Sequence, residues 1–422
     1  MVLLRRTTAP LQRCGRPLVQ RALSSGARLT HAAQIGDAIH CTWADGSSGR
    51  FHLTWLRDHC PNTVHPDSGQ RTVELRHLPR AIPDKIDVGE AGRSLALQWP
   101  AEAVLANGQV TSAFDAGWLR QQCCDINGSG TDGSATAASS SSSVKLWCAS
   151  DFPQGPRPTR SWSEVVEDDS ALLACLRNLQ LYGFALIDGC PTTEDGTLRL
   201  AERVGQVQMT FYGGPVWDTA PRAEGEVVDT AYSNVELPLH TDCAYLHHQP
   251  GLQLFNCMEQ AQVASKGSLE GSTRLCDGFH AAEVLRAEHP DAFDFFSRVA
   301  LPFRHAEGGV HVEHAAPVFS LDPRTGAAVG FRYNELDRAP LAPPLTYGDV
   351  GAFYAHQETL VQVLHRLEVA VRLEAGTALI LNNHRVLHGR YAFRGRRNML
   401  GAYLTPDDWM SNLRVLEARH EG

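Results

Sequence analysis

The chain has 422 residues, of which 43% are hydrophobic and 20% are charged, a balance that is typical of a globular protein of two or three domains. Its formal net charge of -9 argues against a general nucleic-acid-binding protein, and no apolar run reaches the ~18 residues of a membrane span. The 11 cysteines show no CxxC spacing, which favours reduced thiols inside a cell over a disulfide scaffold.

The N-terminal segment, residues 1–30, is rich in arginine, leucine, alanine and serine and precedes the first acidic residue, Asp37. An arginine-rich stretch without acidic residues predicts a mitochondrial transit peptide, and therefore a protein of the matrix. A disordered basic tail or a plastid signal would have a similar composition.

Residues 33–122 predict a small β-rich domain. Hydrophobic and polar residues alternate in 38–43, 50–56 and 95–99, as expected for half-buried strands, and residues 112–120 predict a short closing helix. Cys60 and His65 could be two ligands of a structural zinc ion. Two ligands are too few to define such a site, and a buried thiol with a surface imidazole is the favoured explanation of the pair. Residues 123–146 contain a serine-rich run of low complexity and predict a linker.

Residues 147–422 carry both helical and strand patterns. Apolar residues at helical spacing predict helices over 169–181, 192–204, 281–297 and 354–371. Buried strands are predicted over 183–188, 251–255, 377–381 and 401–404. Helices followed by many strands predict an α+β, mainly β fold, in which a double-stranded β-helix (jelly roll) is backed by helices.

The stretch 237–242, Leu-Pro-Leu-His-Thr-Asp, contains the strongest chemical signal. His240 and Asp242 are two residues apart, so at an extended strand end their side chains lie on one face. A second histidine, for which His388 is the best candidate, would complete a two-His-one-carboxylate triad for non-haem Fe(II). Other His-X-acid triplets occur in the chain, and for any one of them a surface ion pair is the commoner explanation.

These residues, together with the motifs at 55–60 (Trp-Leu-Arg-Asp-His-Cys), 250–254, 277–279, 383–390 and 401–403, carry a family resemblance. The chain resembles the Fe(II)- and 2-oxoglutarate-dependent oxygenases of carnitine biosynthesis, which act on trimethyllysine or γ-butyrobetaine. The resemblance implies Fe(II), 2-oxoglutarate, dioxygen and ascorbate as cofactors. It implies iron ligation by His240, Asp242 and His388, and anchoring of 2-oxoglutarate by Arg397 and Thr273. In the N-terminal domain, the family binds zinc with several cysteines, whereas here Asn62 stands where a cysteine is expected, so zinc is doubtful.

The resemblance also implies a substrate site for a small trimethylammonium amino acid. The positions of the family's aromatic cage are matched by Trp217, Tyr232, Tyr403 and, with a shifted spacing, Tyr212, for which Phe211 is an alternative. Such a cage suits a cation that has no hydrogen-bond donor. Asp229 could pair with the α-ammonium of trimethyllysine, and Asn334 could bind a substrate carboxylate.

The implied activity is hydroxylation of N6,N6,N6-trimethyllysine to 3-hydroxy-trimethyllysine, the first step of carnitine biosynthesis. Hydroxylation of γ-butyrobetaine to carnitine is the main alternative. An oxygenase for another amine or sulfonate, or a non-catalytic module that binds trimethylammonium groups, would share parts of the pattern. No partner among nucleic acids or membranes is expected, and a homodimer is one of the oligomeric states that the sequence leaves open.

Overall fold

The computed structural model describes residues 26–65, 68–78, 80–104, 110–127, 144–157, 159–220, 233–263, 265, 267–307 and 309–420. The chain divides into two compact units, one before Ser142 and one spanning Ser142–His420. Most of the predicted transit peptide, 1–25, and most of the predicted linker, 128–143, lie outside the described residues. Across the described ranges, no helix combines the length and the apolar character needed to cross a lipid bilayer.

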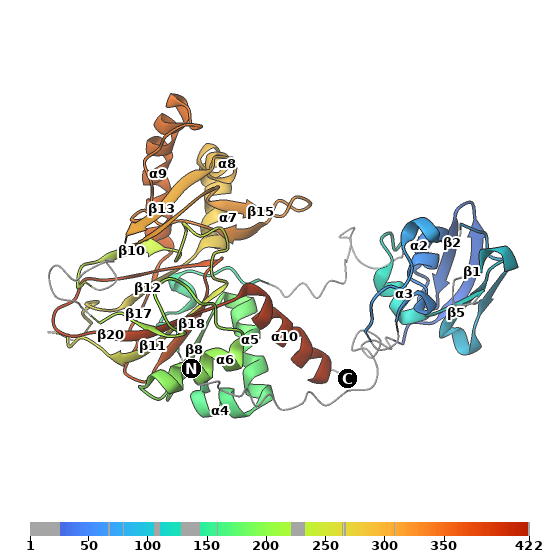
Figure 1. Cartoon of the computed structure of the whole chain (residues 1–422), viewed down its shortest axis with the longest axis horizontal. Helices are drawn as coiled ribbons and strands as arrows, with labels where there is room; N and C mark the ends of the chain where they lie inside the picture. The colour runs from blue at the N-terminus through green and yellow to red at the C-terminus, as the bar shows by residue number, and fades with distance from the viewer. Residues whose placement is uncertain are drawn as a thin grey trace. The chain divides into compact units, whose positions relative to one another are not determined.

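In its described ranges, the N-terminal unit contains two antiparallel three-stranded sheets and two short α-helices (Figure 1). The sheets are β1 (Leu29–Ile35), β2 (Ala38–Trp43) and β3 (Ser48–His52), and β4 (Lys85–Val88), β5 (Ser94–Gln98) and β6 (Thr111–Asp115). The helices are α2 (Leu53–Asp58) and α3 (Ala116–Gln122), and both contribute to one apolar core with the strands.

Two predicted elements of this unit are wrong in part. The predicted strand 50–56 ends at His52, because the His52 ring accepts the backbone N–H of Thr54 and so caps α2. The predicted helix 112–120 begins only at Ala116, where Asp115 caps the backbone N–H of Trp118. In both places a cap residue turns a strand directly into a helix.

The second unit contains two larger sheets and two hairpins. The six-stranded sheet has the order β7 (Arg160–Ser161), β8 (Phe184–Asp188), β18 (Ala378–Asn382), β11 (Leu252–Glu259), β20 (Asn398–Leu404) and β9 (Trp217–Asp218). The four-stranded sheet has the order β10 (Leu237–His240), β19 (Val386–Arg390), β12 (Thr273–Asp277) and β17 (Val369–Val371). The hairpins are β13 (Leu301–Glu307) with β14 (Val310–Ala316), and β15 (Phe319–Leu321) with β16 (Ala328–Phe331).

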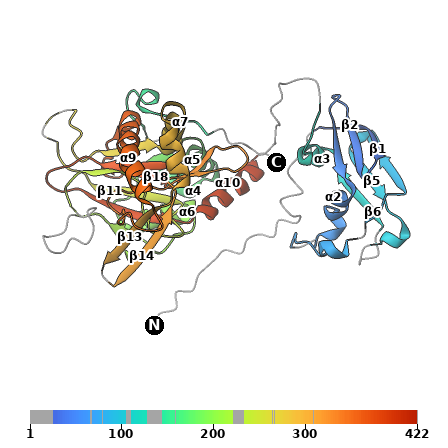
Figure 2. The ribbon, with the colours of Figure 1, turned by 90° about the horizontal axis from the view of Figure 1, so that it is seen from above.

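Among the residues that the structure describes, α-helices complete this unit (Figures 1 and 2). They are α4 (Trp162–Glu167), α5 (Asp169–Tyr182), α6 (Glu194–Val204), α7 (Gly278–Glu288), α8 (Pro290–Arg298), α9 (Tyr347–Leu367) and α10 (Pro406–His420). Helices α5, α6 and α10 share an apolar cluster with β11, β18 and β20, and therefore cover one face of the six-stranded sheet. Helices α7, α8 and α9 share another cluster with β12 and β19 of the four-stranded sheet.

A third apolar cluster joins the two sheets to each other. Leu379 and Leu381 of β18 belong to this cluster, whereas Ile380 belongs to the cluster beneath the helices. Leu275 and Val386 contribute from the four-stranded sheet. Because side chains alternate across a strand, β18 is buried on both faces, and this explains its almost wholly apolar sequence.

The predicted helices of this unit are correct in part. Helices α5 and α6 follow their predicted ranges closely. The predicted helix 281–297 is two helices, which meet at His289 and Pro290, because proline has no N–H to continue the first helix. The predicted helix 354–371 begins earlier, at Tyr347, and its predicted end is wrong, because Val369–Val371 is a strand paired with β12.

Candidate active site

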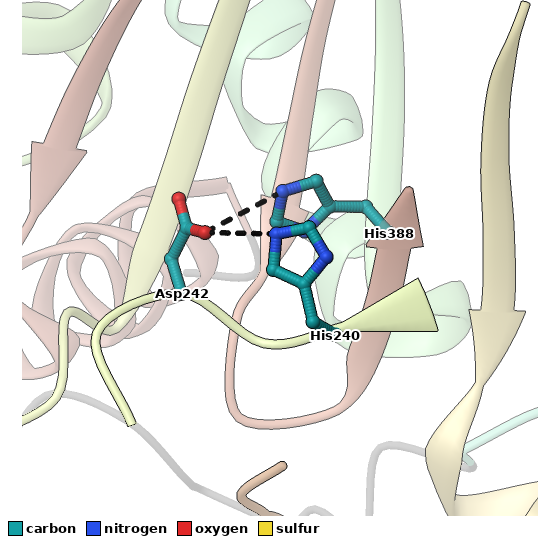
Figure 3. Close-up of side chains that lie close together, drawn as sticks. All are labelled: His240, Asp242 and His388. Carbon is teal, nitrogen blue, oxygen red and sulfur yellow. Dashed lines mark ion pairs between the residues drawn. The ribbon is translucent and has the colours of Figure 1, made fainter. Parts of the chain in front are cut away.

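Three metal-ligating side chains meet at one edge of the four-stranded sheet (Figure 3). Strands β10 and β19 are antiparallel neighbours with His240 opposite His388, and Asp242 lies just beyond the end of β10. The His240 Nε2 and His388 Nε2 atoms lie 3.2 and 3.7 Å from Asp242 Oδ1. Of the residues that the structure describes, only these form a group of three or more His, Cys, Asp or Glu ligand atoms within 4.8 Å of one another.

Hydrogen bonds fix the orientation of the Asp242 carboxylate. The hydroxyl of Tyr403 donates to Asp242 Oδ2 at 2.7 Å, and the side-chain amide of Gln253 donates to the same oxygen. The backbone N–H of Asp242 donates to Asn383 Oδ1 at 2.8 Å. With Oδ2 engaged by two donors, Oδ1 is the oxygen that faces the two imidazoles. Outer hydrogen bonds of this kind orient the first-shell ligands of metal sites.

The histidines present their Nε2 atoms to the same point. His240 Nδ1 lies 2.7 Å from the carbonyl oxygen of Pro238, so Nδ1 carries an N–H and Nε2 is the nitrogen that would bind a metal. The ring of His388 is buried against that of His240, with 4.4 Å between the ring centroids. Two imidazole nitrogens and one carboxylate oxygen form the donor set of a non-haem Fe(II) site.

The three groups strongly perturb one another's ionisation. Burial opposes ionisation of Asp242, but the adjacent His388 and His240 rings outweigh burial and hold the pKa of this carboxyl well below its usual range. Burial would lower the pKa of His240, but its hydrogen bond to Asp242 and the carboxylate charge raise it. Burial and the neighbouring His240 lower the pKa of His388 to about 3. In the metal-free site, one proton is therefore held between His240 and Asp242.

The three metal-ligating residues line a cavity, and Arg397 is a buried cation in the wall of that cavity. Its side chain is only 6% exposed, and across the described ranges no carboxylate lies within salt-bridge distance of it. Its guanidinium donates to the carbonyl of Gly271 at 3.0 Å and to the hydroxyl of Thr273 at 3.3 Å. Burial lowers the pKa of Arg397 to about 9, so the group remains charged at neutral pH. A buried, uncompensated charge is costly, and the cavity therefore favours an anionic ligand here.

Aromatic rings form another wall of the cavity. The rings of Trp217 and Tyr403 are 5.1 Å apart, and Tyr212 lies 6.4 Å from Trp217. Trp217 can lie flat over β20 because position 401 is glycine: a Cβ on Gly401 would come within 2.3 Å of the indole ring. The hydroxyls of Tyr212 and Tyr245 are 2.9 Å apart, and both residues line the cavity.

The other predicted substrate residues have mixed outcomes. Asn334 lines the cavity, and its amide donates to Asp337 at 2.7 Å. Phe211, the alternative to Tyr212, is outside the cavity lining and stacks between Tyr212 and His305. Asp229 and Tyr232 lie outside the described residues.

Several residues of the cavity lining were not predicted from the sequence, and Gln253, Tyr245 and Asp337 are among them. Gln253 carried a usable signal, because it is a polar residue within the apolar strand β11, and a buried amide needs a polar partner. Tyr245 and Asp337 lie in irregular segments, where no periodic pattern indicates the direction of a side chain.

The two proposed zinc ligands lie in the N-terminal unit. Cys60 is buried, and its thiol faces the carbonyl of Thr111 at 3.9 Å, to which Asn62 also donates at 2.8 Å. His65 is exposed and accepts the backbone N–H of Ser68. Within the ranges described, neither residue belongs to a cluster of three or more metal-ligating side chains.

The comparisons with known proteins agree with this chemistry. The profile of the taurine catabolism dioxygenase TauD, TfdA family matches residues 149–403, more than half of the chain. The chain is 32% identical over 390 residues to the mitochondrial trimethyllysine dioxygenase of Gallus gallus, covering 90% of this chain and 86% of that protein. It is 31% identical over 376 residues to the Homo sapiens protein of the same name, covering 87% of this chain and 83% of that one.

A bacterial relative is similar over a comparable length. The γ-butyrobetaine dioxygenase of a Pseudomonas species is 29% identical over 398 residues, covering 92% of this chain and 96% of that protein. The match extends through both units of the structure, because it spans more of the chain than the oxygenase profile does. The chain therefore belongs to the TauD, TfdA family of dioxygenases, together with these trimethyllysine and γ-butyrobetaine dioxygenases.

Proposed function

We propose that the chain hydroxylates N6,N6,N6-trimethyllysine at C3, with Fe(II) and 2-oxoglutarate, in the first step of carnitine biosynthesis. The supporting observation is that one cavity contains three kinds of group: a His-Asp-His cluster, a buried arginine without a carboxylate partner, and a wall of aromatic rings. The names of the relatives from Gallus gallus and Homo sapiens support the same reaction.

In this proposal His240 Nε2, His388 Nε2 and Asp242 Oδ1 hold Fe(II). The donor set and the spacing of the three atoms fit that ion. Bound Fe(II), with 2-oxoglutarate, dioxygen and ascorbate as a supporting reductant, supplies the oxidising power to hydroxylate an unactivated carbon, with succinate and carbon dioxide as the other products. The hydrogen bonds from Tyr403 and Gln253 to Oδ2 of Asp242 keep the Oδ1 atom turned toward the metal position.

Arg397 is proposed to bind the distal carboxylate of 2-oxoglutarate. A guanidinium presents a planar fork that meets a carboxylate through two parallel hydrogen bonds. Thr273 fixes one side of that fork and is itself part of the cavity wall. Such an anion would neutralise the buried charge of Arg397, so its binding offsets the electrostatic cost of burying that guanidinium.

The aromatic wall is proposed to hold the trimethylammonium group. This cation cannot donate a hydrogen bond, and attraction to ring faces is the interaction that remains. Trp217, Tyr403 and Tyr212 supply three faces, and Tyr245 stands behind Tyr212. Because the Tyr403 hydroxyl also contacts Asp242, the cage is adjacent to the metal ligands, so a substrate whose cation lies in the cage would be held beside the metal position.

Trimethyllysine and γ-butyrobetaine differ at the polar end of the molecule, so the residues that bind this end would select between them. We propose that Asp229 pairs with the α-ammonium, which only trimethyllysine carries, and that Asn334 binds the carboxylate. Asp337 orients the Asn334 amide, and the second amide hydrogen can still serve a ligand. Hydroxylation of γ-butyrobetaine is the second candidate, favoured by the similarity to the Pseudomonas protein over 92% of the chain.

One experiment tests the reaction and the substrate together. Purified protein is incubated with Fe(II), ascorbate, 2-oxoglutarate and either trimethyllysine or γ-butyrobetaine, and the product is identified by mass and fragmentation. We expect hydroxylated trimethyllysine and one succinate per product. Asp229→Asn should impair trimethyllysine turnover far more than any residual turnover of γ-butyrobetaine. Carnitine as the faster product would replace the proposal by its alternative, and full turnover by His240→Ala would refute the iron assignment.

Three further parts of the interpretation are proposals of the same kind. The two sheets that face each other across the shared cluster are proposed to be the halves of a double-stranded β-helix. The domain limits 33–122 and 147–422, which were drawn from the sequence pattern, are proposed with it. Localisation to the mitochondrial matrix is supported by the arginine-rich segment 1–30 and by the names of relatives, and imaging of the chain with and without that segment would test it.

A further inference from the structure

Outside the catalytic cavity, three histidines lie close together in pairs. His247 and His248 are in the segment between β10 and β11, and His314 is on β14. The ring centroids of His247 and His314 are 4.9 Å apart, and so are those of His247 and His248. None of the three belongs to the lining of the cavity that contains Asp242.

The spacing of two nitrogens in this group is that of metal ligands. His247 Nδ1 and His314 Nδ1 are 3.4 Å apart, which is longer than the 2.7–3.2 Å usual for an N–H hydrogen bond. Zinc binds imidazole nitrogen at about 2.0–2.1 Å with tetrahedral angles, so two such ligands lie roughly 3.3–3.4 Å apart. The two rings are nearly perpendicular, with 89° between their planes, so they meet edge to face and are not stacked.

The backbone holds both histidines in place before any ion binds. The Arg332 guanidinium donates to the carbonyl oxygens of Ala244 and Leu246, each at 2.7 Å, and thereby fixes the turn that carries His247. His314 is held by the pairing of β14 with β13, in which it is opposite Phe303. Burial, followed by the charge of Arg332, lowers the pKa of His314, so this ring is a neutral ligand at physiological pH.

We propose that His247 and His314 bind a divalent ion of the Zn²⁺, Cu²⁺ and Ni²⁺ class at the surface, with His248 as a third ligand. Imidazole nitrogen is a ligand of choice for these ions. The exposed His248 ring must rotate about its side-chain bonds to reach the ion, and solvent completes the coordination. The site is separate from the proposed Fe(II) site and does not depend on the proposed reaction.

The bound ion would tie the β13–β14 hairpin to the segment that supports an iron ligand. His247 is five positions after Asp242, and between His247 and β11 the Gln249 amide donates to the backbone carbonyl of Asp242 at 2.8 Å. An ion at His247 and His314 therefore restrains the hairpin and this segment together. The expected consequence is slower local opening of both segments when zinc is present.

The test is a titration of the metal-free full chain with Zn²⁺, in which the bound zinc is counted by a chromogenic chelator. Because the catalytic cluster can also take zinc, the measured quantity is the difference between variants. We expect His247→Gln/His314→Gln to bind one zinc fewer than the wild type. His311→Gln is the matched control, because His311 is an exposed histidine on the same hairpin, and it should bind as much zinc as the wild type.

A second measurement protects the result against misfolding of the double variant. Hydrogen exchange of β14 in the wild type should slow on addition of Zn²⁺, and the single variant His247→Gln, which leaves the hairpin unchanged, should abolish this effect. Fe(II)-dependent turnover after removal of zinc should be the same in the His247→Gln variant and the wild type. Equal zinc counts in the wild type and the double variant, or zinc-dependent slowing that persists in His247→Gln, would overturn the proposal.

Discussion

Tyr403→Phe tests the central feature of the proposed site, the orientation of the metal-binding carboxylate. The substitution removes one hydroxyl, which donates to Asp242 Oδ2 at 2.7 Å, and keeps the ring that packs 5.1 Å from Trp217. The pKa of Tyr403 is raised by burial and by the nearby Asp242 charge, so the hydroxyl stays protonated and donates at any physiological pH. The change therefore affects the carboxylate and leaves the aromatic wall in place.

The expected magnitude follows from the type of bond. A hydrogen bond to a charged group contributes about 1.5–3 kcal/mol, and each 1.4 kcal/mol is a tenfold change in affinity. Loss of the Tyr403 hydroxyl should therefore weaken Fe(II) binding by about 10- to 150-fold if the full contribution is felt at the metal. The Gln253 amide still donates to the same oxygen, and this favours the lower half of that range.

The assay is an anaerobic Fe(II) titration in the presence of 2-oxoglutarate, followed through the absorbance of the ternary complex. Tyr391→Phe is the control, because that hydroxyl donates to a different carboxylate, Glu368, at 2.9 Å. The control should bind Fe(II) like the wild type. An unchanged Fe(II) affinity in both Tyr403→Phe and Gln253→Leu would refute the argument that these two donors orient Asp242.

Three further predictions concern the other parts of the site. Arg397→Met should raise the KM for 2-oxoglutarate by at least about 30-fold, because loss of one partner of a buried charge pair costs about 2–5 kcal/mol. Arg396→Met is the control and should leave this KM unchanged, because the Arg396 side chain is 87% exposed. Succinate release measures the KM of both variants. Fe(II) affinity should fall as the pH falls through the raised pKa of His240, because the metal must displace the proton that His240 shares with Asp242. Below that pKa the affinity should fall about tenfold for each pH unit. Fe(II) titrations from pH 8 to pH 6 test whether the affinity falls or rises. Trp217→Leu should raise the KM for trimethyllysine by about 2- to 30-fold through lost cation–π attraction, with the KM for 2-oxoglutarate unchanged.

The sequence predicted the residues of the cavity better than the limits of the elements that position them. The cavity brings together His240, His388 and Arg397, which are as much as 157 positions apart. His388 was already a candidate partner of His240 from the residues, and Arg397 was added through the family resemblance. Periodicity alone predicted the buried core strand around Leu379, because a strand buried on both faces leaves a continuous apolar run. It could not predict which strands are neighbours, since pairing depends on contacts far apart in the chain.

The wrong limits of the predicted helices 281–297 and 354–371 have local physical causes. Val369–Val371 continues the apolar spacing of α9, but its backbone pairs with Thr273–Leu275. These residues therefore form a strand and do not extend the helix. At Pro290 the helical spacing also continues, but proline ends the hydrogen-bond ladder of α7. In both cases the apolar pattern describes which residues are buried, and tertiary pairing or backbone chemistry decides the element that buries them.

The pairing of β10 with β19 positions the two histidines of the site. Antiparallel pairing places His240 opposite His388, so the distance between the two imidazoles is set by the sheet and not by a flexible loop. The same sheet carries Thr273 on β12, next to β19, while Tyr403 and Gln253 come from paired strands of the opposite sheet. Ligands from one sheet and their hydrogen-bond donors from the other can keep a fixed geometry only while the two sheets stay packed. A cavity-forming substitution in the shared core, such as Leu381→Ala, should therefore weaken Fe(II) binding as well as lower stability by about 2–5 kcal/mol, although Leu381 is not one of the three ligand residues.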